Sequence, residues 1–236
     1  MLHVRRISEA GSLIAVKAVL FDLGGTLVKT PSAARILEGM LENFGVPRSR
    51  EEIEEARKTV EKQFDLEELP VLGDAFWLRW NAKILEHLGI RKDSFLLAER
   101  IVKEWWQYAD VELYADAEET LRMLKQRGLK VGLVTNGLES DIREVLPRVN
   151  LTGFFDVEVT SNLAGKIKPH RGIFMHALEK LGVKPHEAMY VGDLLKRDYE
   201  GARNCGLKAL LIDRESSVGK EGVEKIRSLT ELLEYV

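Results

Sequence analysis

The chain has 236 residues, of which 45% are hydrophobic and 31% are charged, and its formal net charge is -3. This length suits one large domain or one domain with an insertion, and the composition supports a packed core. The chain has no basic block, no apolar run long enough to span a bilayer and a single cysteine, Cys205. These features argue against nucleic acid or a membrane as partner and exclude an internal disulfide, and we expect a cytoplasmic protein.

Residues 1–15 precede the first predicted strand and carry several charged side chains. Their apolar part is too short for a secretory signal. An additional edge strand and a natural start near Val16 are both compatible with this segment. We expect residues 1–15 to be a poorly attached N-terminal extension.

The first predicted strand covers residues 18–21 and ends at Asp22, which Gly24 and Gly25 follow closely. A short run of apolar, strand-forming residues is typical of a parallel strand that is buried on both faces. Open α/β sheets bind their ligands at the carboxyl ends of the strands. We therefore expect Asp22 to lie in the functional site.

Four helices are predicted after this strand, at residues 32–44, 49–66, 73–88 and 93–108. Ser49 and Glu52 have the spacing of a capping box, and Asp93 is a candidate N-cap. The four tryptophans of the chain, Trp77, Trp80, Trp105 and Trp106, fall in the last two helices, and we expect them to form the core of the bundle rather than to line a pocket. The pattern predicts a four-helix cap domain at residues 30–110, inserted between residues 16–29 and 111–236 of a core domain.

Strands and helices alternate in the remainder of the chain. Helices are predicted at residues 118–127, 139–149, 171–181, 198–204 and 228–235, and strands at residues 130–135, 157–160, 188–191 and 208–212. Alternation of this kind predicts an α/β core with a doubly wound parallel sheet and helices on both faces.

Four short motifs carry the polar residues of the predicted core, and three of them directly follow a strand. They are Asp22 with Thr26, Thr135-Asn136-Gly137, Lys168-Pro169, and Gly192-Asp193 with Asp198. Parallel strand ends converge on one edge of a sheet, so we expect three carboxylates, a hydroxyl and an ammonium group to meet there. A divalent cation such as Mg²⁺ relieves the repulsion between crowded carboxylates.

In this order, and with a helical insertion after the first of them, the motifs resemble those of the haloacid dehalogenase superfamily, and the resemblance spans nearly the whole chain. It implies that Asp22 is a nucleophile that forms an aspartyl-phosphate, and that Lys168 stabilises this intermediate. It implies further that Thr135, with its neighbour Asn136, binds the phosphoryl group. The implied Mg²⁺ ligands are Asp22, the backbone carbonyl of Gly24, Asp193 and Asp198.

Gly24 departs from the family pattern, because phosphatases of the superfamily carry a second aspartate there. That aspartate protonates the leaving oxygen and later activates water. Three interpretations remain open: a phosphatase with an acid from the cap or from solvent, a phosphatase that prefers good leaving groups or holds a long-lived aspartyl-phosphate, and a weakly catalytic binding or regulatory module.

Two other hydrolases of the same superfamily are further alternatives. Its dehalogenases also lack this acid, but they work without Mg²⁺ and usually carry serine and asparagine in place of Gly192-Asp193. Its phosphonate hydrolases need a cap lysine, for which Lys58, Lys62 and Lys83 are candidates.

The leading prediction is a Mg²⁺-dependent phosphatase that acts on a small phosphorylated metabolite through Asp22. We expect the protein to be a monomer or a homodimer.

Overall fold

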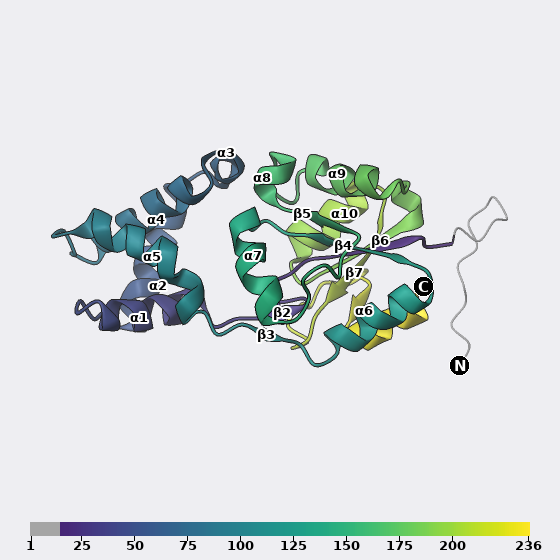
Figure 1. The fold of residues 1–236 in the computed structure, drawn as a ribbon, viewed down its shortest axis with the longest axis horizontal. Helices are drawn as coiled ribbons and strands as arrows, with labels where there is room; N and C mark the ends of the chain where they lie inside the picture. The colour runs from purple at the N-terminus through teal and green to yellow at the C-terminus, as the bar shows by residue number, and fades with distance from the viewer. Residues whose placement is uncertain (1–14) are drawn as a thin grey trace.

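The computed structural model describes residues 15–236, so the predicted N-terminal extension lies outside the described residues apart from Ala15. In the described part, six parallel strands form one sheet in the order β5-β4-β1-β6-β7-β8 (Figure 1). The central strand is β1 (Ala18–Phe21), with β4 (Lys130–Val134) and β6 (Ala188–Gly192) beside it. The outer strands are β5 (Val157–Val159), β7 (Lys208–Ile212) and β8 (Lys225–Ile226). The predicted α/β fold with a parallel sheet is therefore confirmed.

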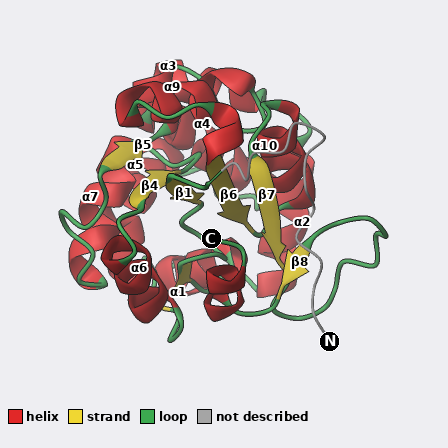
Figure 2. Cartoon of the chain, turned by 90° about the vertical axis from the view of Figure 1, so that its right-hand side faces the viewer, coloured by secondary structure: helices red, strands yellow, loops and turns green. Residues whose placement is uncertain are grey.

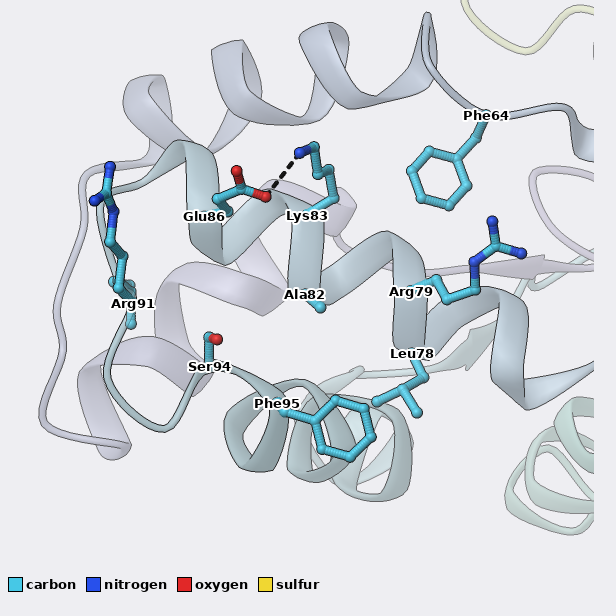
Figure 3. Close-up of a pocket in the computed structure, with 10 residues that line it drawn as sticks. Phe64, Leu78, Arg79, Ala82, Lys83, Glu86, Arg91, Ser94 and Phe95 are labelled. Atoms are coloured by element: carbon cyan, nitrogen blue, oxygen red, sulfur yellow. Dashed lines mark hydrogen bonds and ion pairs between the residues drawn. The ribbon is translucent and has the colours of Figure 1, made fainter.

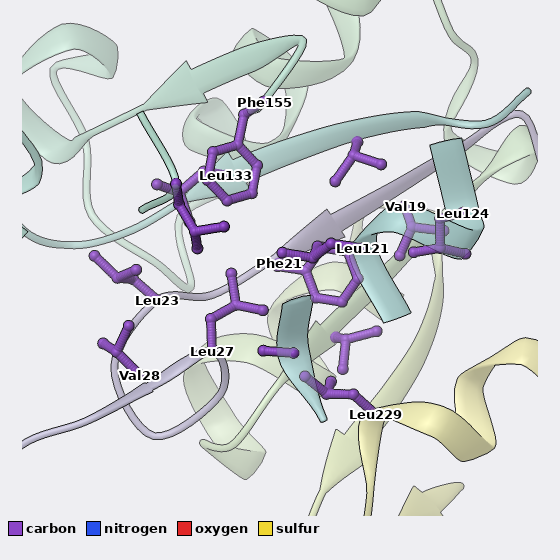
Figure 4. Close-up of a cluster of buried hydrophobic side chains, with 14 of the residues drawn as sticks. Val19, Phe21, Leu23, Leu27, Val28, Leu121, Leu124, Leu133, Phe155 and Leu229 are labelled. Carbon is purple, nitrogen blue, oxygen red and sulfur yellow. The ribbon is translucent and has the colours of Figure 1, made fainter. Parts of the chain in front are cut away.

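Strand β1 is buried on both faces because every one of its side chains is apolar. Val19 and Phe21 point into one hydrophobic cluster (Figure 4). Ala18 and Leu20 point into another cluster on the opposite face. Phe21 lies in register with a residue of β4 on one side and of β6 on the other. The three central strands therefore end at the same level, which brings the residues that follow them to one edge.

Helices cover both faces of the sheet (Figure 2). One face packs against α6 (Ala117–Gln126), α7 (Glu139–Arg148) and the 3₁₀ helix Leu229–Glu234. The other face packs against α9 (Arg171–Leu181) and α10 (Gly201–Asn204). This is the doubly wound arrangement that the alternating pattern predicts.

The helical insertion at residues 30–110, called the cap below, forms a separate hydrophobic cluster to which Leu138 of the core also belongs. Its helices are α1 (Ala33–Asn43), α2 (Arg50–Glu61), α3 (Leu69–Leu72), α4 (Asp74–His87) and α5 (Ser94–Tyr108). Helix α3 packs against α8 (Ser161–Ala164) of the α/β core (Figure 1). The cap therefore touches the core at a second place besides the chain crossing.

Three predictions for the cap differ from the structure. The cap contains the short helix α3 in addition to the four predicted helices. The helix predicted to reach residue 66 ends at Glu61, and a turn and the 3₁₀ helix Leu66–Glu68 follow it. Asp93 is not a side-chain N-cap, because its backbone is left-handed, with φ of 55°, and its carboxylate accepts no hydrogen bond from α5. The capping box of Ser49 and Glu52 is confirmed.

The chain crosses between core and cap through an antiparallel pair of strands that the sequence did not predict. These are β2 (Val28–Lys29) and β3 (Glu112–Leu113), and Lys29 forms an ion pair with Glu112 across them. Each strand has only two residues, which is too short for any alternating pattern.

Four elements of the core also differ from the prediction. The helix expected at residues 198–204 begins earlier, as a π-helical turn at Leu195–Glu200, before it continues as α10. The C-terminal helix is 3₁₀ rather than α, and neither β8 nor α8 was predicted. No helix within residues 15–236 combines the length and the apolar character that a membrane crossing needs.

We expect Gly132→Ala to destabilise the protein, because β4 packs closely at this glycine. A Cβ there would lie 2.5 Å from Leu20 Cδ2 and 2.8 Å from Val157 Cγ1. Overpacking a core typically costs ~1–3 kcal/mol of unfolding free energy. The matched control is Gly39→Ala in α1, where the added Cβ meets nothing within 4 Å and should stabilise by ~0.5–1 kcal/mol. Denaturant unfolding measures both, and equal effects would contradict the expectation.

Candidate active site

The carboxyl ends of the three central strands carry the predicted site residues. Asp22 directly follows β1, Thr135 follows β4 and Asp193 follows β6. Lys168 reaches the same place from the loop before α9, and Asp198 from the π-helical turn. The structure thus brings together the three carboxylates and the ammonium group, and it places Thr135 at the end of the neighbouring strand β4.

The ammonium group of Lys168 holds these elements together. Its side chain is 3% exposed, and Nζ donates to Asp22 Oδ1 at 2.5 Å and to Asp198 Oδ1 at 2.7 Å. The third donor of the ammonium group reaches the hydroxyl of Tyr190 at 2.8 Å. A buried ion pair is tolerated when its remaining hydrogen-bonding groups are satisfied, and all three donors here have an acceptor.

Tyr190 was not predicted as a site residue, although it lies at the centre of this network. Its hydroxyl accepts from Lys168 and lies 3.1 Å from the Val134 carbonyl oxygen and 3.2 Å from Asp198 Oδ1. The residue is fully buried in β6. A phenol in an otherwise apolar central strand was the available signal, because a buried hydroxyl needs a partner.

Asn136 holds Lys168 in place through its backbone. The Asn136 carboxamide accepts a hydrogen bond from the Lys168 backbone N–H at 2.6 Å and donates to the Lys168 carbonyl oxygen at 3.2 Å. Both ends of the carboxamide are therefore engaged within the protein. Substrate binding by Asn136 stays a prediction.

Thr135 offers a hydroxyl donor at the same edge. Its Oγ1 accepts from the Gly137 backbone N–H at 3.1 Å. Within residues 15–236, no acceptor lies within hydrogen-bonding distance of the hydroxyl proton, and the residue is 8% exposed. This geometry suits a contact with a phosphoryl oxygen.

Oxygen atoms of Asp22, Asp193 and Asp198 all lie within 4.8 Å of one another. Asp193 Oδ1 is buried and has no hydrogen-bond partner in the described structure. Gly25, with φ of 75°, allows this approach, since a Cβ there would lie 2.2 Å from Asp193 Oδ2. A crowded set of hard oxygens that includes one unpartnered atom fits a divalent cation such as Mg²⁺.

Burial raises the pKa of Asp22 to about 7, even though Lys168 opposes this shift, and the charges of Asp198 and Asp193 raise it further. Burial and the charge of Asp198 also raise the pKa of Asp193 to about 6. Burial disfavours the charge of Lys168, but the two carboxylates outweigh it and raise the pKa of the ammonium group. Without a cation, the site therefore retains protons that ordinary carboxyl groups release.

Gly24 leaves open space beside Asp22. It is exposed, and a Cβ built on it would meet nothing within 4 Å. The glycine is therefore not required by packing, unlike Gly25. An acidic side chain would fit at position 24, and the chain provides none there.

A cavity of about 360 Å³ lies between the cap and the core. All four tryptophans border this cavity. The expectation that they would form the bundle core rather than line a pocket is therefore only partly right. Trp80, for example, is 6% exposed within the cap cluster but also contributes to the cavity wall. A second cavity of about 500 Å³ lies within the cap, among residues that include Phe64, Arg79 and Phe95 (Figure 3). None of the site carboxylates lines this second cavity.

We expect the metal-free protein to lose stability relative to its Asp22→Asn variant as the pH rises from about 4 to about 7. The folded pKa of Asp22 lies above the unfolded value, so the folded state binds the extra proton in this window, and that stabilisation disappears once the pH passes the folded pKa. The variant has no such proton to lose. Denaturant unfolding of both proteins across this pH range measures the difference, and Mg²⁺ should reduce it. Parallel pH profiles would contradict the expectation.

Comparison with known proteins supports a family assignment. The family profile described as haloacid dehalogenase-like hydrolase matches residues 16–206. The chain is 32% identical over 206 residues to a glyceraldehyde 3-phosphate phosphatase of Methanopyrus kandleri, which covers 84% of each chain. It is 31% identical over 207 residues to an N-acylneuraminate-9-phosphatase of Rattus norvegicus, which covers 84% of this chain and 82% of the relative.

Among solved structures, a HAD phosphatase from Thermococcus onnurineus matches with a TM-score of 0.62 and 27% identity, over 93% of this chain and 97% of that one. The chain belongs to the haloacid dehalogenase-like hydrolases.

Proposed function

We propose that the protein is a Mg²⁺-dependent phosphatase that hydrolyses small phosphomonoesters through an aspartyl-phosphate on Asp22. The observation that carries this proposal is the position of the Asp22 carboxylate. It lies against the ammonium group of Lys168, with Asp193 and Asp198 at one side. Similarity to chains that are named phosphatases supports the same activity.

The first step uses the free oxygen of Asp22. Lys168 holds Oδ1, whereas no hydrogen bond within the described residues occupies Oδ2. Oδ2 attacks phosphorus, a bond forms between them, and the bond from phosphorus to the ester oxygen breaks with its electrons on that oxygen. The positive charge of Lys168, whose donors stay on Asp22, Asp198 and Tyr190, and the Thr135 hydroxyl would offset the negative charge that spreads over the phosphoryl oxygens.

The second step returns the enzyme to its starting state. Water attacks phosphorus, the bond to Asp22 breaks, a proton leaves to solvent and inorganic phosphate is released. Asp22, Asp193, Asp198 and the Gly24 carbonyl would hold the cation. A bound Mg²⁺ would lower the pKa of these carboxyl groups and offset phosphoryl charge.

The proton for the leaving oxygen comes from solvent in this proposal, because Gly24 supplies no acid and is open to water. Esters whose leaving groups are weakly basic should therefore react fastest. The same argument favours slow turnover of ordinary alkyl phosphates.

The alternative hydrolases find less support in the site. The acidic pair Asp193 and Asp198 favours a cation, which dehalogenases do not use. A phosphonate hydrolase needs a lysine near the substrate, but the described wall of the cavity between cap and core contains none. Lys83 instead pairs with Glu86 beside the second cavity.

Phosphate release from 4-nitrophenyl phosphate should require Mg²⁺ and should fall on the order of 10³-fold or more in Asp22→Asn, because the variant lacks the attacking oxygen. Chelator should abolish the parent activity. The matched control is Asp65→Asn, a cap residue whose carboxylate caps the short helix Leu66–Glu68. A folded parent protein that binds Mg²⁺ but hydrolyses no ester would refute the proposal and leave the binding-module interpretation.

Gly24→Asp should accelerate hydrolysis of ethyl phosphate by about 10²–10⁴-fold, the usual effect of a positioned general acid. The gain should be much smaller for 4-nitrophenyl phosphate, whose leaving group needs little protonation. Gly24→Asn adds the same volume without the acid and is the control. Steady-state rates on both esters measure the effect. An equal gain from the asparagine variant would show that packing, not proton transfer, is responsible.

A further inference from the structure

The cavity between cap and core has two wall residues that adjoin residues of the proposed phosphoryl site. Its wall includes Asp141 and Arg197 of the core. Arg197 directly precedes Asp198. A Cβ built on Gly137 would lie 3.1 Å from Asp141 Oδ2 and 3.4 Å from Thr135 Oγ1, so these two side chains are close neighbours. A substrate whose phosphoryl group contacts Thr135 would therefore direct its leaving group toward this cavity.

Flat aromatic rings form much of the cap side of the cavity. All four tryptophans of the chain contribute to it: Trp77, Trp80, Trp105 and Trp106. Trp77 and Trp80 are held in place by packing on Phe76, with ring centroids 5.2 Å and 5.8 Å away. Indole rings bind planar ligands by stacking and edge contacts, which an aliphatic chain does not reproduce.

Three polar side chains in the wall have unused hydrogen-bond donors. Arg197 forms no ion pair or side-chain hydrogen bond within residues 15–236. The nearest carboxylate to the half-buried Arg57 is that of Glu54, at 3.9 Å. Asn81 is 7% exposed, and its carboxamide has no hydrogen bond to the described protein. A guanidinium group and a buried amide without partners, together with Arg57 in its long ion pair, favour an anionic acceptor, for which arginine is well suited.

The carboxylates in the wall do not cancel this preference. Both oxygens of Asp141 are engaged, by Trp106 Nε1 at 3.0 Å and by the Leu138 backbone N–H at 2.7 Å. Glu61 and Asp74 are exposed to solvent, which weakens the effect of their charge. Burial nevertheless lowers the pKa of Arg57, and the charges of Glu54 and Glu61 only partly oppose this shift. The buried part of the wall is thus aromatic and donor-rich.

We propose that this cavity binds the leaving group of the substrate, and that the substrate is a phosphomonoester that carries a planar aromatic ring and a carboxylate at the far end from the phosphate. The ring contacts the indoles, and the carboxylate accepts hydrogen bonds from Arg57 and Asn81. This inference rests on the proposed phosphatase function, and it adds the substrate class.

Binding is measured with Asp22→Asn, which removes turnover from the readout. Every tryptophan of the chain lines the cavity, so intrinsic fluorescence reports its occupancy directly. The probes are ethyl phosphate, benzyl phosphate and 4-carboxybenzyl phosphate, in the presence of Mg²⁺. Affinity should rise by about tenfold with the ring and by about tenfold again with the carboxylate. Choline phosphate is the cationic probe, because an aromatic wall can also bind quaternary ammonium groups.

Two variants test which side chains bind the ring and which bind the carboxylate of the ligand. Trp105→Leu keeps an apolar side chain but removes a ring that contacts no other aromatic ring in the described structure, and it should reduce the advantage of benzyl over ethyl phosphate. Arg57→Gln should reduce the advantage of 4-carboxybenzyl over benzyl phosphate. Arg79→Gln is the matched control, since Arg79 lies in the cap but lines the other cavity (Figure 3), and it should keep both ratios.

The outcomes separate this inference from the proposed function. Equal affinity for the three phosphate esters, or tighter binding of choline phosphate than of 4-carboxybenzyl phosphate, would overturn the substrate class while phosphate release by the parent protein stays intact. Absence of phosphate release from every ester by the parent protein would refute the phosphatase instead. A rise in affinity along the series, lost in Trp105→Leu and Arg57→Gln but kept in Arg79→Gln, supports the proposed ligand chemistry.

Discussion

A single buried ammonium group connects the parts of this site. Lys168 donates to Asp22, Asp198 and Tyr190, which come from three different segments of the chain. Two carboxylates this close together repel each other in a medium that excludes water, and the lysine compensates their charge. Apolar packing away from the site holds in place the strands and turns that carry these residues. The chemistry of the site therefore depends on how accurately the sheet places one lysine.

The sheet achieves this placement through its strand order. Strand β1 lies between β4 and β6, although the three are far apart in the sequence, and all three end level with one another. Close contacts at Gly25 and Gly192 then let the acidic turns approach, because a Cβ at either position would overlap Asp193 or Asp198. Gly25 and Gly192 are needed because they leave room for the side chains of Asp193 and Asp198. The space beside Gly24, in contrast, is filled by no atom of the described residues.

The sequence predicted the parallel sheet, the helical cap and the convergence of the site residues, because apolar strands followed by polar turns have few other arrangements. It did not predict Tyr190 as part of the site, since a tyrosine in a buried strand usually satisfies its hydroxyl locally. Nor did it predict that Asn136 holds the backbone of Lys168, because the loop conformation decides that contact. The two-residue strands β2 and β3 could not be predicted from the sequence, because they are defined by the pairing of two distant segments and not by a local sequence pattern. The residues that line the cavity could not be predicted either, because tertiary packing brings them together.

The paired crossing strands have a mechanical consequence for the cap. A unit attached by two independent loops can swing and twist in several directions. Here the outgoing and returning segments are bonded to each other as β2 and β3, and Lys29 pairs with Glu112 across them. The cap is therefore joined to the core here by one paired ribbon rather than by two separate loops, and α3 against α8 and Trp106 against Asp141 are further contacts between them. A displacement of one crossing segment must therefore carry the other with it or break the β2–β3 pairing.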